Sequence, residues 1–360
     1  MNVAQTMNAP SAHDTNPLKA QVLEAFGAVF KEATVTGADD FFDLGGDSLL
    51  AEELAMRLTE IAGHEVRISA LFDHPTPDAM ASFLAPGEKA SAAPASMRPP
   101  IFMVHGASGY TMPKPSFFEG LAEGQKLELF QLPGLMGDRR IPDNIPEIAA
   151  IYVDQIERDH PEGRVHISAF CDGAIIAVEM ARQLNQRGRK VDHMVLLDPG
   201  VPKILRRAHE GIPARFRSRV GFALVTGRFT GGQGIEDIND PRLRKLRGKL
   251  AGFEAYIRSL RARLTGHRAD RYYRGRRLFA ESRLISAWSH FWPTPFLEEV
   301  DLICTKDRQS FHEAENSFWR MVLPNFRIWP MLEKHEDVTG GASINVSEKL
   351  QALFDESEGR

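Results

Sequence analysis

The sequence predicts a small helical domain followed by a larger α/β domain that has a mainly parallel sheet and a helical insertion. Apolar residues recur at helical spacing between residues 16 and 85. A stretch rich in alanine, serine and proline follows at 86–98, which is a linker composition. Short apolar runs then alternate with helical segments, a pattern typical of a parallel sheet covered by helices on both faces.

Composition limits the class of protein. The chain has 360 residues, of which 43% are hydrophobic, so it can bury a sizeable core. No apolar run is long enough to span a membrane, and the polar residues 1–15 predict a flexible N-terminus without a secretion signal. The two cysteines exclude a disulfide framework and a zinc site built from thiols alone. We therefore expect a cytoplasmic protein with no membrane partner and no metal.

The charge distribution is asymmetric. Residues 201–290 hold 21 basic and 7 acidic residues, an excess of 14 positive charges, whereas the whole chain has a net charge of −4. The rest of the chain is therefore at −18, and the insertion is basic on an acidic body. Such a surface can steer an acidic protein or a phosphate, or pair with a substrate carboxylate. We expect no nucleic-acid partner, because the sequence contains no known nucleic-acid-binding motif.

The first domain is predicted to contain four helices. They fall within 16–32, from Asp47 or Ser48 onward, and around 68–73 and 77–84. Asp47 and Ser48 are good N-cap residues, which places Ser48 at an exposed helix N-terminus. Free N–H groups at such a terminus favour a nearby phosphate.

The segment "DDFFDLGGDSLL" closely resembles the attachment motif of acyl and peptidyl carrier proteins. The resemblance covers 16–85 and implies that 4′-phosphopantetheine is attached covalently to Ser48. It also implies a phosphopantetheinyl transferase as a partner. The Leu-Gly-Gly sequence favours a peptidyl over a polyketide carrier.

The second domain, 99–360, is predicted from its alternating pattern. Helices are expected at 146–158 and 172–187, and a mostly helical insertion at about 200–295. The expected strands are 101–105, 127–132, 164–168, 191–197, 299–304 and 326–330.

A candidate nucleophile lies at the turn in "HISAFCDGAIIAVEMARQL". Cys171 sits between a predicted strand and a predicted helix, and its neighbours Ala169 and Gly173 are small enough for a tight turn. A thiolate paired with a histidinium is a good nucleophile near neutral pH. Cys304, inside an apolar strand, is expected to be a buried structural residue instead.

This turn resembles the Gly-x-Ser-x-Gly elbow of α/β-hydrolases, with cysteine in place of serine. The chain order resembles the thioesterase domains that end nonribosomal peptide and polyketide assembly lines. The resemblance implies Asp198 as the acid and His335 as the base, with Asp307 as the alternative acid. "HGASGY" resembles the oxyanion loop of the family, which implies that the backbone N–H groups of Ala107 and Asp172 bind the oxyanion.

Together these resemblances imply a terminal carrier–thioesterase didomain supplied by upstream synthetase modules or carrier-loading enzymes. The acyl or peptidyl chain would pass to Cys171 and leave by cyclisation, to a lactone or lactam, or by hydrolysis. Because one thioester replaces another, the transfer is nearly neutral in free energy. Two other functions remain as alternatives, an editing hydrolase and a non-catalytic acyl carrier scaffold. A further alternative is that Cys171 is an engineered substitution for a serine.

Overall fold

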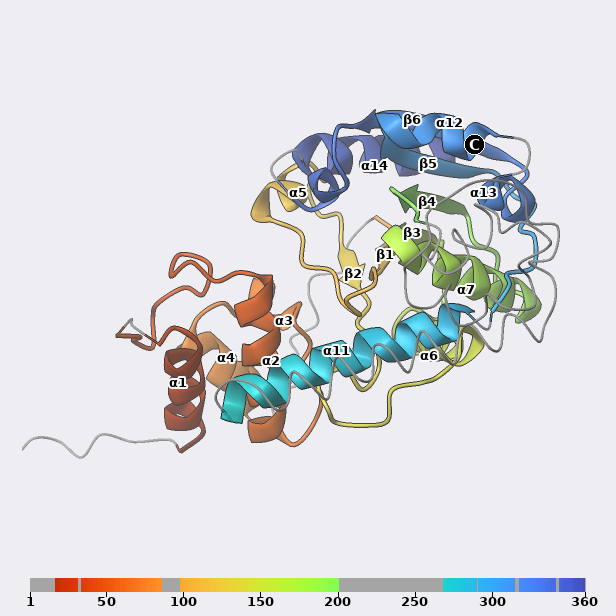
Figure 1. The fold of residues 1–360 in the computed structure, drawn as a ribbon. Helices are drawn as coiled ribbons and strands as arrows, with labels where there is room; N and C mark the ends of the chain where they lie inside the picture. The colour runs from red at the N-terminus through yellow and green to blue at the C-terminus, as the bar shows by residue number, and fades with distance from the viewer. Residues whose placement is uncertain are drawn as a thin grey trace, which may run out of the picture. The chain divides into compact units, whose positions relative to one another are not determined.

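The structure is a computed structural model, and the chain divides into two compact units, Met1–Ala92 and Ala93–Arg360 (Figure 1). The structure describes residues 17–31, 34–85, 98–200, 268–289, 291–314, 317–340 and 343–359.

The first unit is helical. Its described residues form α1 (Pro17–Val29), α2 (Ser48–Ala62), α3 (Ala70–Asp73) and α4 (Pro77–Leu84). α1 packs against α2 and α4, and the apolar faces of these helices bury Phe26 and Leu54 completely. Phe41, from the loop before α2, fills the same core and meets the Phe26 ring edge-on, with 6.4 Å between the centroids. The predicted four-helix domain is confirmed.

The two glycines before α2 have different physical roles. Gly45 has a φ of 85°, in the left-handed region that glycine adopts without strain. A Cβ on Gly46 would lie 2.3 Å from a ring carbon of Phe41, so only glycine lets the backbone pass the ring. Asp47 then caps α2, because its Oδ1 accepts the N–H groups of the second and third helical residues at 2.9 Å each.

The second unit is built on a six-stranded sheet with the order β2-β1-β3-β4-β5-β6, in which every neighbouring pair is parallel. The strands are β1 (Ile101–Val104), β2 (Leu127–Leu129), β3 (His166–Phe170), β4 (His193–Leu197), β5 (Val300–Thr305) and β6 (Phe326–Leu332). Because all the strands run in the same direction, the residues that follow them meet at one edge of the sheet.

Helices cover both faces of this sheet (Figure 1). On one face α6 (Ile145–Asp159) packs against α7 (Ala174–Gln186), which contacts β1 and β3. On the other face α5 (Pro115–Glu119) packs against α14 (Ser343–Glu358), which contacts β4. The predicted fold class, a helical carrier domain and an α/β-hydrolase domain, is confirmed. The remaining described helices are α11 (Arg268–Ser289), α12 (Gln309–Glu313) and α13 (Phe318–Val322).

The third strand begins later than predicted, at His166 instead of 164, and runs to Phe170. Just before the strand, the side chain of Asp192 takes the place of a backbone partner in the sheet ladder. The Val165 N–H donates to Asp192 Oδ2 at 2.9 Å, and the Asp192 N–H donates back to the Val165 carbonyl at 3.0 Å. The strand ends at Phe170, directly before Cys171.

Most of the predicted insertion at 200–295 lies outside the described residues, including the basic side chains between 201 and 267. Where this region is described again, α11 is helical, as expected. In the described ranges, no helix combines the length and apolar composition that a bilayer span requires. The same ranges contain no group of three metal-ligating side chains.

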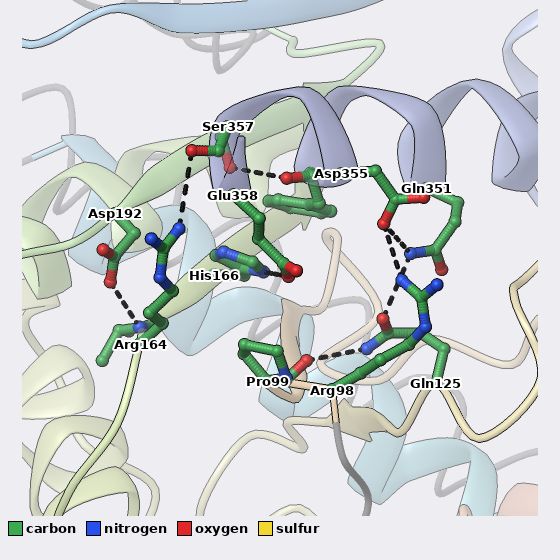
Figure 2. Close-up of polar contacts among 12 residues, drawn as sticks. Arg98, Pro99, Gln125, Arg164, His166, Asp192, Gln351, Asp355, Ser357 and Glu358 are labelled. Carbon is green, nitrogen blue, oxygen red and sulfur yellow. Dashed lines mark hydrogen bonds and ion pairs between the residues drawn. The ribbon is translucent and has the colours of Figure 1, made fainter. Parts of the chain in front are cut away.

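Side chains near the end of α14 contact His166, the first residue of β3, and Arg98, shortly before β1 (Figure 2). The buried His166 ring stacks on Phe354 with 4.7 Å between the centroids, and its Nδ1 lies 3.8 Å from Glu358 Oε1. Arg98 Nη1 pairs with Asp355 Oδ1 at 2.7 Å. These contacts fasten α14 to the amino ends of the strands, at the edge of the sheet opposite Cys171.

Candidate active site

Cys171 lies at the tight turn between β3 and α7. Residues Cys171–Gly173 form a single 3₁₀ turn, η1, that leads into the helix. The φ of Cys171 is 55°, in the left-handed region that costs strain in residues other than glycine. Strain of this kind is found at functional sites, where the surrounding structure holds it. As a whole residue, Cys171 is neither fully buried nor fully exposed.

The segments around this turn approach it too closely for most side chains. A Cβ on Gly173 would lie 2.0 Å from the His105 carbonyl oxygen, which explains the glycine at that position. A Cβ on Gly106 would lie 3.3 Å from the Cβ of Cys171, and one on Gly200 would lie 3.7 Å from its Sγ. The loops after β1 and β4 therefore both come close to the side chain of Cys171.

Asp198 follows β4, has a φ of 42° and is fully buried. Its Oδ1 accepts the Thr305 N–H at 3.0 Å, and its Oδ2 accepts Arg308 Nη1 at 2.8 Å. Burial raises the pKa of this carboxyl, but hydrogen bonds from His335 and Thr305 and the charge of Arg308 outweigh burial. The pKa of Asp198 therefore lies below its ordinary value, and the group is a carboxylate at neutral pH.

His335 begins a 3₁₀ turn, η4 (His335–Val338), shortly after β6. Its Nδ1 lies 2.5 Å from Asp198 Oδ2. With Nδ1 donating to the carboxylate, Nε2 of the neutral ring is left as a proton acceptor. One face of the ring stacks on Phe170, the residue before Cys171, with 4.8 Å between the centroids. The structure thus brings together the acid and the base that the sequence predicted.

The state of the thiol differs from the expected thiolate–imidazolium pair. Burial and the Asp172 carboxylate raise the pKa of Cys171 to about 12, and the Asp172 N–H and Arg308 offset this only in part. Among the described residues, no hydrogen bond joins the Cys171 thiol to the His335 ring. Because the turn is largely desolvated, the Cys171 thiol keeps its proton at neutral pH in the resting site. Attack by such a thiol requires a base that removes its proton during the reaction.

The predicted oxyanion donors lie on backbone segments close to the thiol. The Asp172 N–H donates to the Cys171 sulfur, and Ala107 follows Gly106 in the loop after β1. The buried His105 shapes this loop, since its Nδ1 lies 2.8 Å from the Gly106 carbonyl and its Nε2 lies 2.7 Å from the Tyr152 hydroxyl. Burial lowers the pKa of His105 to about 4, so this ring is neutral.

The alternative acid is placed differently. Asp307 is exposed in a 3₁₀ turn, η3 (Lys306–Arg308), and His335 bonds to Asp198 instead. Cys304 is fully buried in β5, as expected of a structural cysteine, and burial raises its pKa to about 12.

Sequence reasoning missed Arg308, which directs its side chain to Asp198. A cation just after β5, at the edge where the site forms, was the available signal.

The carrier domain presents Ser48 as an exposed residue at the first position of α2. The N-cap is supplied by Asp47, so the serine is not required for that role. Leu49, the next residue, is 55% exposed, although it is large and apolar. An exposed hydroxyl at the N-terminus of a 15-residue helix fits the attachment of a phosphate-linked arm.

Two domain families match the chain. Residues 99–294 match the thioesterase domain family, and residues 20–84 match the phosphopantetheine attachment site family. The first match covers more than half of the chain, so this protein belongs to the thioesterase family. It joins a phosphopantetheine carrier domain to a thioesterase domain.

Similar proteins include large synthetases. A dimodular nonribosomal peptide synthase of Bacillus subtilis (strain 168) is 33% identical over 170 residues, which cover 45% of this chain and 7% of that protein. Indigoidine synthase of Dickeya dadantii (strain 3937) is 28% identical over 215 residues, covering 57% of this chain and 14% of that protein. The chain therefore spans a small part of the length of these relatives.

Among solved structures, a four-domain nonribosomal peptide synthetase, crystallised with AMP and glycine, aligns with a TM-score of 0.50. The alignment covers 98% of this chain and 27% of that one, at 20% identity. A likeness at this level of identity supports the fold alone.

Proposed function

We propose that this chain is the terminal release unit of a nonribosomal peptide or polyketide assembly line. An acyl or peptidyl chain is transferred to Cys171 and then released by cyclisation or hydrolysis. The observation that carries this proposal is the 2.5 Å hydrogen bond between His335 and Asp198, made by an imidazole that stacks on Phe170, the residue before the strained Cys171. An oriented imidazole next to a nucleophile is the arrangement that acyl transfer requires.

The carrier domain delivers the substrate. Ser48 is the proposed attachment point, and bound phosphopantetheine supplies a thiol that presents the acyl group as a thioester. We propose that a phosphopantetheinyl transferase modifies Ser48 and that upstream modules or a loading enzyme charge the arm. The exposure of Ser48 at the start of α2 supports this assignment, since both enzymes must reach it.

In the first half-reaction Cys171 Sγ attacks the carbonyl carbon of the thioester while His335 Nε2 accepts the thiol proton. Asp198 stabilises the imidazolium that forms, and the N–H groups of Ala107 and Asp172 bind the oxyanion. The bond between the carbonyl carbon and the carrier sulfur then breaks. His335 returns the proton to the departing thiolate, and the acyl group remains on Cys171.

In the second half-reaction neutral His335 accepts a proton from the releasing nucleophile, which is water or a hydroxyl or amine of the chain itself. Attack on the Cys171 thioester breaks its carbon–sulfur bond, and His335 gives the proton back to Sγ. Because the cysteine intermediate is itself a thioester, it retains activation that an oxygen ester on serine would have lost. That retained free energy favours release that must close a ring.

Intact-protein mass spectrometry tests the proposal. The full chain is charged on Ser48 by a phosphopantetheinyl transferase with an acyl-coenzyme A, and the acyl mass is followed over time. We expect the wild type and the control Cys304→Ser to lose the acyl group while Cys171→Ala stays charged. Product mass then separates cyclisation from hydrolysis, which adds water. A wild-type chain that stays charged indefinitely would instead indicate a carrier scaffold, and equal loss from wild type and Cys171→Ala would exclude Cys171 as the nucleophile.

A further inference from the structure

Arg308 makes an unexpected contact with the buried acid of the site. It lies in η3 after β5, and its side chain is 34% exposed. Its Nη1 donates to Asp198 Oδ2 at 2.8 Å and lies 3.3 Å from the Asp198 carbonyl oxygen. The same Oδ2 receives the hydrogen bond from His335 Nδ1. A permanent cation and the imidazole therefore share one oxygen atom.

We propose that Arg308 is a positioning residue of the triad, which fixes the Asp198 carboxylate toward His335 and balances its charge. This inference rests on the proposed function of the same site. It concerns how the site is tuned, and Arg308 is not assigned contact with the acyl group.

The positioning role follows from how the carboxylate is held. Oδ1 of Asp198 is held by the Thr305 N–H, and Oδ2 is held by Arg308 and His335. Rotation of the carboxyl group would break these bonds inside a site where Asp198 is 0% exposed, and water would not replace them. The contact of Arg308 with the Asp198 carbonyl also braces the left-handed backbone at that residue.

The charge role follows from a count of the reacting groups. When the thiol proton has moved to His335, the site contains a thiolate, an imidazolium and the carboxylates of Asp198 and Asp172, with a sum of two negative charges. Arg308 halves that excess, which matters because unbalanced charge is costly in a desolvated site. The same cation disfavours a proton on the thiol. In agreement, Arg308 is among the groups that lower the pKa values of Cys171 and Asp198.

Other charged groups around the site also affect the pKa of Cys171, some by raising it and some by lowering it. Asp172 lies beside the thiol, and His312 in α12 is buried with a pKa lowered to about 4 by burial. The described titratable and charged residues at and just after the carboxyl ends of the strands include His105, Asp172, Asp198, Cys304, Lys306, Asp307, Arg308, His312, Glu313, Glu333, Lys334, His335, Glu336 and Asp337. Lys306 is paired with Glu333, so its charge is already balanced.

The test compares three variants of the full chain. Arg308→Gln removes the charge, and Arg308→Lys keeps the charge but replaces the planar guanidinium. Arg187→Gln is the matched control, because Arg187 also pairs with carboxylates, Asp154 and Glu157 at 2.6 Å each. Arg187 lies at the end of α7, a 13-residue helix that begins beside Cys171, and so roughly 20 Å from the thiol.

The readout is the pH dependence of Cys171 alkylation by iodoacetamide, measured on its own peptide, together with the pH dependence of acyl release. We expect Arg308→Gln to displace both profiles to higher pH by about one unit, so that alkylation at a fixed pH below the midpoint slows about tenfold. Arg308→Lys should keep the wild-type profiles but release acyl groups more slowly, because a single ammonium holds the carboxylate less rigidly. Arg187→Gln should match the wild type in both.

An unchanged alkylation profile in folded Arg308→Gln, or the same displacement in Arg187→Gln, would overturn the charge role. Acyl release by Arg308→Lys at the wild-type rate would overturn the positioning role. This comparison with Arg308→Lys can still be made if Arg308→Gln does not fold. Failure of the proposed function looks different. In that case Cys171 would never carry the acyl group, whether or not its alkylation profile depends on Arg308.

Discussion

The rings of Phe170 and His335 are stacked, with 4.8 Å between their centroids and an angle of 17° between their planes. Phe170 is the last residue of β3 and immediately precedes Cys171, so the strand that places the proposed nucleophile also supports the proposed base. The imidazole is thereby held between an aromatic face and the Asp198 carboxylate. Two separate contacts thus restrict the ring to orientations in which Nδ1 faces the acid.

Replacing Phe170 by leucine should weaken this support while keeping the apolar volume. Aromatic pairs contribute about 0.5–1.5 kcal/mol beyond area burial, so acyl release is expected to slow by roughly two- to tenfold. The measurement is the rate of acyl loss from the charged chain. Phe83→Leu is the matched control, because Phe83 also stacks on a histidine, His74 at 4.4 Å, but in the carrier domain. An equal loss of rate in both variants would show that the Phe170 stack has no specific role.

Asp198 and Asp307 give a direct comparison of the two candidate acids. Asp198→Asn should reduce acyl transfer by about 100-fold or more, because an amide favours the wrong tautomer of His335 and cannot balance the imidazolium. Asp307→Asn should leave the rate within about twofold, as expected for an exposed residue away from chemistry. Single-turnover rates of the two charged variants decide between them, and a larger effect at Asp307 would reverse the assignment of the acid.

Replacing Cys171 by serine tests why the chain uses sulfur here. Serine can still accept the acyl group, but the product is an oxygen ester that has lost the activation of the thioester. We therefore expect Cys171→Ser to load and then to turn over more slowly than the wild type, with the acyl-serine adduct accumulating. The measurement is the amount of adduct and the rate of release on the same charged chain. Equal turnover by both forms would remove the energetic reason for cysteine.

The buried His166 should make folding stability depend on pH. Burial lowers the pKa of its ring to about 4, well below the ordinary value of 6.5. A base with a lowered folded-state pKa binds more protons when unfolded, so its stabilising contribution is complete above about pH 6.5 and is lost as pH falls toward 4. Between about pH 7 and pH 5 this single group costs about 2 kcal/mol.

The variant His166→Phe should remove that share of the pH dependence. Within the part of the chain that the structure describes, both ring nitrogens of His166 lack a hydrogen-bond partner. The ring stacks on Phe354, so a phenyl ring fits the same place. Urea unfolding at the two pH values measures the difference, with His64→Asn, a change at an exposed histidine, as the control. A pH dependence that persists unchanged in His166→Phe would show that other groups are responsible for it.

Local patterns in the sequence were sufficient to predict the fold, because each element carries its own signal. The small residues at 169 and 173 indicated the turn, and the structure supplies a cause, since a side chain at Gly173 would strike the His105 carbonyl. The positions of Asp198 and His335 followed from chain order after their strands. The structure places the two side chains together, although their roles stay predictions until they are tested.

Other properties of the site depend on side-chain direction and burial, which spacing does not encode. Arg308 is one residue from the exposed Asp307, yet its side chain turns inward to Asp198. The expected reactive thiolate is, in the structure, a thiol whose pKa is raised mainly by burial. The third strand also began later than predicted, because the Asp192 side chain replaced part of the ladder.

Peptide mapping of a rapidly quenched reaction can show whether the acyl group resides on the Cys171 sulfur during turnover. The full chain is charged on Ser48, quenched in acid at intervals, digested and analysed for the acyl mass on each peptide. We predict a transient adduct on the Cys171 peptide that hydroxylamine removes and that is absent from Cys171→Ala. Release of product at the wild-type rate by Cys171→Ala, with no adduct on the Cys171 peptide at any time, would show that the acyl group does not pass through Cys171.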